Sequence, residues 1–168
     1  EAEGYQVIVP DQKCCSVASL SYGNLEDAKE NINYNLKSLV QVVNRGYDIV
    51  ADCPSCSLML KEEYLDVVDT EEAKLVADNT YHINEYLLNL KENNELKLDF
   101  KSNKTDFLYH TPCHLKAQGL ENSTEKLLDL VPELQIKELD AGCCGIAGTF
   151  GLKEDKYNEA LAQYEKAR

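Results

Sequence analysis

Residues Leu134–Gly151 read LQIKELDAGCCGIAGTFG, and this stretch decides the fold because it joins a short apolar run, an acidic turn and two adjacent cysteines. Adjacent cysteines do not easily form a disulfide with each other, since the geometry of that bond is restrictive. Two thiols side by side in a loop therefore indicate metal or redox chemistry. Glycine at every third position from Gly142 to Gly151 lets the backbone turn tightly or approach a bulky group.

The same pattern occurs near the start of the chain. Tyr5–Cys15, YQVIVPDQKCC, aligns with Leu134–Cys144, LQIKELDAGCC, and both cysteine pairs match at a constant offset of 129 residues. After a one-residue gap the offset becomes 128, and Glu26-Asp27 matches Glu154-Asp155. Residues matched in this way are called counterparts below. A period near 128 residues is the size of a domain, so the sequence indicates parts of two tandem modules.

Composition excludes several classes of protein. The chain has 168 residues and a net charge of -13, which argues against sequence-independent nucleic-acid binding, because that needs clustered lysine and arginine. No apolar run approaches the roughly 20 residues that span a bilayer, and the first residues do not resemble a signal peptide. Seven cysteines in a protein expected to be cytoplasmic favour ligand or catalytic roles over structural disulfides.

Alternating patterns along the chain predict an α/β fold in which a mostly parallel sheet is flanked by helices. An apolar stripe after an N-cap at Asn24 predicts a helix that ends before Gly46, and apolar spacing predicts one long helix from Glu71 to about Lys91. The segment after each cysteine group is also expected to be helical. Four short runs predict strands: Tyr5–Val9, Tyr47–Ala51, Thr105–Tyr109 and Leu134–Leu139.

Every cysteine follows one of these predicted strands. Because the carboxyl ends of parallel strands meet at one edge of a sheet, the thiols are expected to converge there. Thiolates are soft ligands, which suit an iron-sulfur cluster or zinc. Cys53 and Cys56 also lie at a predicted helix N-terminus, which stabilises thiolate. The full set of candidate ligands is Cys14, Cys15, Cys53, Cys56, Cys113, Cys143 and Cys144.

Two alternatives remain open from the residues alone. The first is a structural zinc site, which needs four ligands in a tetrahedral arrangement, although two adjacent cysteines fit that geometry poorly. Thiol–disulfide exchange by Cys53 and Cys56 would resemble thioredoxin but leaves five cysteines without a role. His110 and His114, which flank Cys113, are expected to cap the helix or to hydrogen-bond locally.

Three motifs together carry a family resemblance: CPSC at 53–56, YHTPCHLKAQG at 109–119 and DAGCCGIAGTFGLK at 140–153. They resemble the duplicated cysteine-rich CCG modules found in one subunit each of heterodisulfide reductase and anaerobic glycerol-3-phosphate dehydrogenase. The resemblance implies parts of two tandem Rossmann-like modules, with residues 1–102 forming the later part of the first module plus a linker and residues 103–168 the earlier part of the second.

The resemblance also implies a ligand set. Each family module has a lone cysteine, then CCG, then CxxC, and in heterodisulfide reductase such modules hold non-cubane 4Fe-4S clusters. Cys14, Cys15, Cys53 and Cys56 match the later part of the first module, in which Ser16 replaces the CCG glycine, and the other three cysteines match the earlier part of the second. The first lone cysteine would precede Glu1 and the second CxxC would follow Arg168, so both sites are expected to be incomplete and largely apo.

By the same resemblance, the chain is expected to act as an electron-transfer module of an oxidoreductase complex, and another chain would oxidise the substrate. Its partners would be a flavin-bearing dehydrogenase subunit and a quinone-side acceptor, with peripheral attachment to the inner face of the membrane through those partners. The alternatives are a zinc-stabilised or cluster-free scaffold that binds partner subunits, and a heterodisulfide or thiol–disulfide reductase module.

Overall fold

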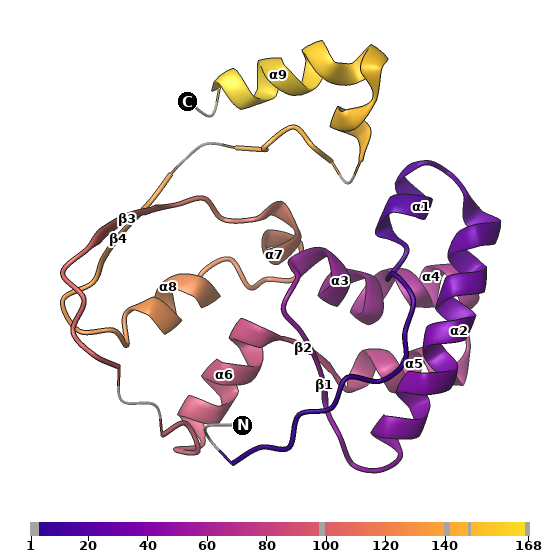
Figure 1. Cartoon of the computed structure of the whole chain (residues 1–168), viewed down its shortest axis with the longest axis horizontal. Coiled ribbons are helices and arrows are strands. Elements are labelled where there is room, and N and C mark those ends of the chain that lie inside the picture. Colours follow the sequence, from indigo (N-terminus) through magenta and orange to yellow (C-terminus); the bar gives the residue numbers. More distant parts are fainter. Residues whose placement is uncertain (1–3, 98–99, 140–141, 148, 167–168) are drawn as a thin grey trace.

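The computed structural model describes residues 4–97, 100–139, 142–147 and 149–166. Figure 1 shows short helices grouped around two small pairs of strands. The elements in chain order are α1 (Val17–Ser21), α2 (Leu25–Val43), β1 (Ile49–Ala51), α3 (Pro54–Leu58), η1 (Met59–Glu63), α4 (Tyr64–Val68), α5 (Glu71–Asp78), β2 (Thr80–His82), α6 (Ile83–Glu92), β3 (Asp106–Tyr109), α7 (Cys113–Ala117), α8 (Ser123–Leu128), β4 (Gln135–Glu138), η2 (Phe150–Leu152), η3 (Glu154–Lys156) and α9 (Tyr157–Lys166).

The strands pair in parallel, which confirms the predicted α/β class. β1 pairs with β2, beginning at Ile49 opposite Thr80, and β3 pairs with β4, beginning at Asp106 opposite Gln135. Within the described residues these are two separate two-stranded sheets, each closed by helical crossovers. The Rossmann-like arrangement and the module boundary after residue 102 stay predictions.

The predicted strand Tyr5–Val9 is wrong. This segment has no strand hydrogen bonds, and the side chains of Val7 and Val9 are 61% and 81% exposed. Its β-branched residues favour an extended chain, but a strand forms only where a neighbour takes its backbone hydrogen bonds, and none of the described segments does so. Instead Tyr47 donates its hydroxyl to the side chain of Gln6 at 2.7 Å, beside the region of β1.

The predicted helix from Glu71 to Lys91 is also wrong, because strand β2 interrupts it. Thr70 caps α5 by accepting from the Ala73 amide, and His82 begins α6 with a capping box that involves Glu85. Between the two helices, the Thr80 hydroxyl donates to the Val76 carbonyl oxygen at 2.7 Å. The apolar residues on both sides keep a helical spacing, so periodicity alone could not reveal the three-residue strand between them.

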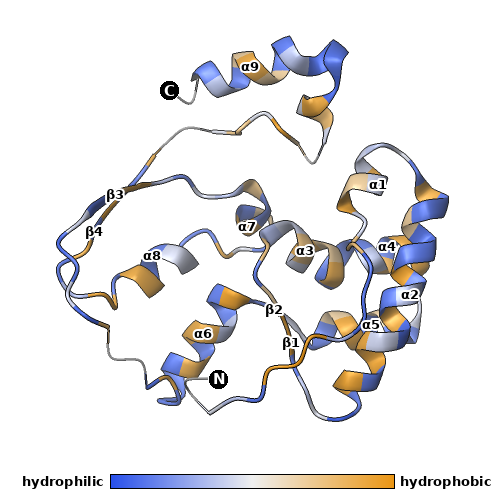
Figure 2. Ribbon diagram, in the orientation of Figure 1, coloured by the Kyte–Doolittle hydropathy of each residue, from blue (hydrophilic) through white to orange (hydrophobic). Residues whose placement is uncertain are grey.

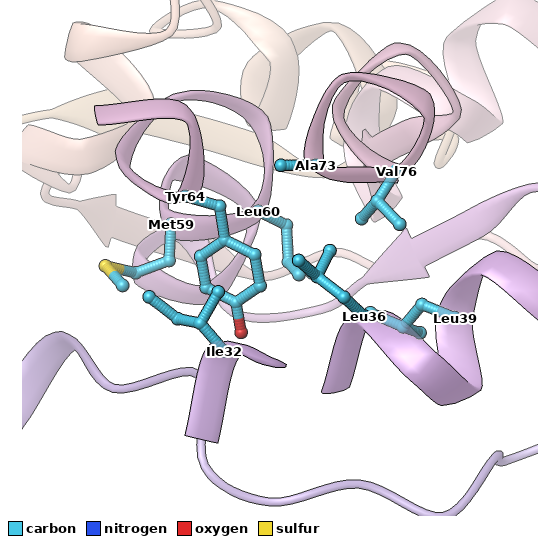
Figure 3. Packing of buried hydrophobic residues seen from close by; sticks show 8 residues of the cluster. All are labelled: Ile32, Leu36, Leu39, Met59, Leu60, Tyr64, Ala73 and Val76. Atoms are coloured by element: carbon cyan, nitrogen blue, oxygen red, sulfur yellow. The ribbon is translucent and has the colours of Figure 1, made fainter. Parts of the chain in front are cut away.

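A single core joins α2 to the helices that follow CPSC. Asn24 caps α2 as predicted, and the buried stripe of α2 packs against the continuous helical segment α3–η1–α4 and against α5 (Figure 3). Burying each large side chain contributes about 1.5–3 kcal/mol, so this contact fixes α2 relative to CPSC. The core cluster consists of Ile32, Leu36, Leu39, Met59, Leu60, Tyr64, Ala73 and Val76.

The repeat is preserved in backbone conformation. Ser16 and its counterpart Gly145 are both buried and both left-handed, with φ of 76° and 83°. The serine at this position therefore keeps the turn that the glycine makes in the CCG sequence, at the cost of a strained backbone. Counterparts also touch directly, since the Ser21 and Thr149 hydroxyls lie 2.7 Å apart.

Gly145 and Gly142 offer a matched test of close packing in this loop. Both have positive φ, but a Cβ on Gly145 would lie 2.6 Å from the Ala160 carbonyl oxygen, whereas among the described residues nothing lies within 4 Å of a Cβ on Gly142. We expect Gly145→Ala to lower the free energy of unfolding by about 1–3 kcal/mol more than Gly142→Ala, and to speed amide exchange in α9. Denaturant titration and hydrogen exchange measure both effects, and equal losses in the two variants would contradict the packing.

Candidate metal centre

The first cysteine loop is held against α2 by one buried side chain, Asn35, which is 3% exposed. The Lys13 amide donates to Asn35 Oδ1 at 2.7 Å, and Asn35 Nδ2 donates to the carbonyl oxygens of Lys13 and Cys14 at 3.3 and 3.2 Å. The same Nδ2 lies 3.1 Å from the Tyr64 hydroxyl, on the helix that follows CPSC. Asn35 therefore fixes the Cys14–Cys15 loop relative to the helical segment that begins at CPSC.

This arrangement brings Cys15 into contact with Cys56, while Cys14 lies beside Cys15 and Cys53 lies beside Cys56. Cys15 Sγ and Cys56 Sγ lie 3.2 Å apart, with Cys56 as the donor. This hydrogen bond is the main reason that the pKa of Cys15 falls to about 6, and the Cys14 thiol lowers it further. The pKa of Cys56 is raised, chiefly because it donates to Cys15, and its neighbour Cys53 raises it as well. The sequence predicted a stabilised thiolate at the CPSC turn, but the structure raises the pKa of Cys56 and places the stabilised thiolate on Cys15.

Tyr64 and Asn35 are the residues that sequence reasoning missed. Tyr64 is fully buried, and burial raises its pKa to about 12, so its phenol stays neutral beside the thiols. In the sequence it occupies an ordinary core position of a helix, and Asn35 is one polar residue among several in α2. Only the fold, which packs these two helices together, shows that both side chains support the cysteine loop.

The cysteines of the second module are arranged more openly. Cys113 begins α7, Cys143 and Cys144 lie in the loop after β4, and all three are exposed. One backbone contact orders the loop, since the Gly145 amide donates to Cys143 Sγ at 3.4 Å. Within the described ranges, no three histidine, cysteine, aspartate or glutamate side chains have the geometry to hold a metal ion. This holds for the first set of thiols as well, in which the structure brings Cys15 and Cys56 into contact.

His110 and His114 hydrogen-bond to residues that are distant in the sequence, contrary to the expectation that they cap the helix or hydrogen-bond locally. A ring nitrogen of His110 lies 2.8 Å from the Gly142 carbonyl oxygen, because β3 and β4 are adjacent and their following loops meet. His114 Nδ1 lies 2.7 Å from Ser55 Oγ, inside the CPSC turn. Gln118 also donates to the Pro54 carbonyl oxygen at 3.1 Å, so α7 packs on α3 and joins the two modules.

Comparison with known proteins follows the same division of the chain. The family profile named CCG, a cysteine-rich domain, matches residues 1–61 and 107–167. The chain is 32% identical over 157 residues to the C subunit of anaerobic glycerol-3-phosphate dehydrogenase from Escherichia coli K12, which covers 92% of the chain and 39% of that relative. It is 30% identical over 168 residues to lactate utilization protein A 2 of Bacillus cereus AH820, covering 94% of the chain and 66% of that protein. No solved structure matches significantly.

The low pKa of Cys15 predicts a distinctive reactivity. Alkylation by iodoacetamide requires the thiolate, so we expect the alkylation rate of Cys15 to rise with a midpoint near pH 6, about three units below the reference value of 9.0. Cys56→Ala removes the donated hydrogen bond and should move the midpoint up, whereas Cys53→Ala keeps that bond and should leave most of the shift. Rates are read by mass spectrometry, and an unchanged midpoint in Cys56→Ala would contradict the assignment.

The same shift links stability to pH. Because the pKa of Cys15 is lower in the folded chain than in the unfolded chain, its deprotonation stabilises the fold. This contribution is complete above the unfolded pKa and is lost as the pH falls through about 6. Denaturant titrations over this range should therefore show a pH dependence that is weaker in Cys56→Ala.

Asn35 is tested against Asn33, an exposed residue of the same helix. Asn35→Ala removes the side-chain partner of the part-buried Lys13 amide and Lys13 carbonyl oxygen, so we expect the free energy of unfolding to fall by about 1–3 kcal/mol and the cysteine loop to loosen. Asn33→Ala should change it by less than about 0.5 kcal/mol. Thermal unfolding measures both changes, and equal effects in the two variants would contradict the role of Asn35 in holding the cysteine loop.

Proposed function

Because this chain belongs to the CCG family of cysteine-rich domains, we propose that it is an iron-sulfur electron-transfer module of an oxidoreductase complex. The observation that carries this proposal is the contact between Cys15, in the loop before α1, and Cys56, in α3, with Cys14 and Cys53 beside them. The chain spans 39% of the E. coli relative, so the activity of the whole complex is part of the proposal.

The residues at this contact fit an iron-sulfur cluster by the chemistry of their donors. Ligands to iron must be deprotonated thiolates, and Cys15 is already close to that state at neutral pH because Cys56 hydrogen-bonds to it. A bound cluster would accept and pass on electrons at a potential tuned by its surroundings. Asn35 would hold the Cys14–Cys15 loop in place, and Tyr64 with the α2 core would shield one side from water.

The second set of cysteines is proposed to hold part of a second site. Cys113, Cys143 and Cys144 would provide three thiolates, and their exposure favours a site that other groups complete. The cluster type is proposed to be 4Fe-4S, by the family resemblance. Helix α7, which begins at Cys113, contacts α3, which contains Cys56, and this adjacency supports transfer between the two proposed sites.

The proposed path of electrons follows the first relative, whose name makes it a subunit of anaerobic glycerol-3-phosphate dehydrogenase. A flavin-bearing dehydrogenase subunit would supply the electrons and a quinone-side acceptor would take them, at the inner face of the membrane. Among the described residues, no helix is both long and apolar enough to cross a bilayer. The proposed attachment to the membrane is peripheral and goes through these partners.

A second candidate function is thiol–disulfide exchange. The 3.2 Å separation of Cys15 and Cys56, with a thiolate beside a protonated thiol, is the specific observation in its favour. Cys15 would attack a disulfide substrate and release one thiolate, and Cys56 would then displace the second as the two cysteines join. A zinc-stabilised scaffold is the remaining alternative.

Iron content separates these candidates. After anaerobic reconstitution with iron and sulfide, we expect a coloured chain with less iron than two full clusters require, because the family resemblance makes both sites incomplete. Cys15→Ser and Cys53→Ser should remove the iron held by the first set of cysteines, whereas Cys113→Ser should leave that portion bound. Iron, acid-labile sulfide and zinc are assayed per chain.

Each other outcome has a defined meaning. A colourless chain that binds zinc would support the scaffold, and a metal-free chain that reduces a small disulfide through Cys15 would support exchange. Two full clusters in this chain alone would show that the assignment of cysteines to modules is wrong.

A further inference from the structure

Two side chains from α7 and its C-cap contact the CPSC turn at the start of α3. His114 Nδ1 lies 2.7 Å from Ser55 Oγ, between the two cysteines of the turn, and the Gln118 side-chain amide donates to the Pro54 carbonyl oxygen at 3.1 Å. Figure 1 shows α7 beside α3, and residues of the two helices are in contact. We call His114 and Gln118, with their bonds to Ser55 and Pro54, the α7 clamp.

The two clamp side chains lie on one face of α7. His114 and Gln118 are four residues apart, about one helical turn, and the Gln118 amide also donates to the His114 carbonyl oxygen at 2.6 Å. Because its nitrogen serves two carbonyl oxygens, the orientation of the amide is fixed. Its other end, Gln118 Oε1, is buried and has no hydrogen-bond partner among the described residues. A buried unpaired acceptor lowers stability, so stability alone does not account for this amide.

The CPSC turn starts its helical segment without a side-chain cap. Cys53 occupies the N-cap position of α3, and its side chain makes no capping hydrogen bond. Within the turn, the Ser57 hydroxyl donates to the Pro54 carbonyl oxygen at 3.1 Å. Among the described residues, the Ser55 hydroxyl is hydrogen-bonded only to His114. The residue between the two cysteines is thus held from α7 and not from within α3.

The contact between α7 and the turn is polar. Figure 2 shows hydrophilic residues alternating with apolar ones along α7, of which only Leu115 is buried. His114 and Gln118 are half-buried, as are Cys53 and Cys56. Hydrogen bonds are directional, whereas apolar packing is not, so the clamp sets the position of the turn in addition to covering it.

We propose that His114 and Gln118 are positioning residues for the first set of cysteines, because they hold the CPSC turn where Cys56 reaches Cys15. The CPSC turn lies in the first CCG match and α7 lies in the second. The first thiol site is therefore completed by a helix of the second copy, the same helix that begins at Cys113. The role of the clamp toward a bound cluster rests on the proposed function, whereas its effect on Cys15 and Cys56 does not.

The test compares two replacements of His114 in the reduced, metal-free chain. His114→Phe keeps a ring of similar shape but removes the hydrogen bond, whereas His114→Asn keeps a polar atom near the position of Nδ1. We expect His114→Phe to speed amide exchange at residues 55–58 by about twofold to tenfold, the effect of losing one hydrogen bond. Dibromobimane, which joins neighbouring thiols, should link Cys15 to Cys56 less by a similar factor, as read by mass spectrometry. His114→Asn should restore both values.

Two further variants of the metal-free chain serve as controls. Ser55→Ala should match the effect of His114→Phe, and the double variant should show no more than either alone, because both remove the same bond. Lys116→Ala changes an exposed residue of α7 and should leave exchange and linking unchanged.

Gln118→Leu separates positioning from stability. It removes the bond to Pro54 and should loosen the CPSC turn, as measured by the same exchange and linking experiments. The free energy of unfolding should hardly change, because the unpaired Oε1 is removed as well and the Pro54 carbonyl oxygen keeps its bond from Ser57.

Iron links the clamp to the proposed function. In the reconstituted chain, His114→Phe should weaken iron binding by the first set of cysteines about tenfold relative to His114→Asn, measured by competition with a chelator. If no variant binds iron, the proposed function fails, and exchange and linking alone decide the clamp. Equal iron affinity in the two variants would overturn the role toward the cluster. Equal exchange and linking in His114→Phe and His114→Asn would overturn the proposal itself.

Discussion

The side-chain amide of Asn35 is the interaction on which the candidate site depends. It satisfies the Lys13 amide and two carbonyl oxygens of the cysteine loop from inside a helix whose other buried residues are apolar. The loop has no regular secondary structure before Val17, so its backbone groups need a partner from elsewhere. Because the same amide reaches Tyr64 in α4, the cysteine loop, α2 and the helical segment that begins at CPSC share one polar contact inside an apolar core.

The two modules differ in how far their thiols are organised. In the first, packing of α2 on the helices after CPSC places Cys15 and Cys56 in contact and lowers the pKa of Cys15. In the second, α9 has no such helices over it among the described residues, and Cys113, Cys143 and Cys144 are exposed. The thiol geometry therefore follows from the hydrophobic core more than from the cysteine motif itself. Exposed thiols are also the ones most open to oxidation.

Much of the fold could be predicted from periodicity and from the repeat. Short apolar runs predicted strands β3 and β4, and the alternation of strands with helices predicted their parallel pairing. The Asn24 cap was predicted from its position before an apolar helical stripe. Two predictions failed where the outcome depends on distant partners. Strand β2 forms because its backbone pairs with that of β1, whereas Tyr5–Val9 is not a strand because no described segment pairs with it. The roles of Asn35 and Tyr64 were hidden for the same reason, since contacts between helices leave no pattern in either helix alone.

The contact between Ser21 and Thr149 has a consequence for the arrangement of the whole chain. These two residues are counterparts, so equivalent positions of the two modules meet at this point, as residues on the axis of an isologous dimer interface do. Lys153 extends the contact by placing its ammonium 4.6 Å from the centre of the Tyr22 ring. The same substitution made at both positions would change both partners of this contact, whereas a substitution in one module would change only one of them.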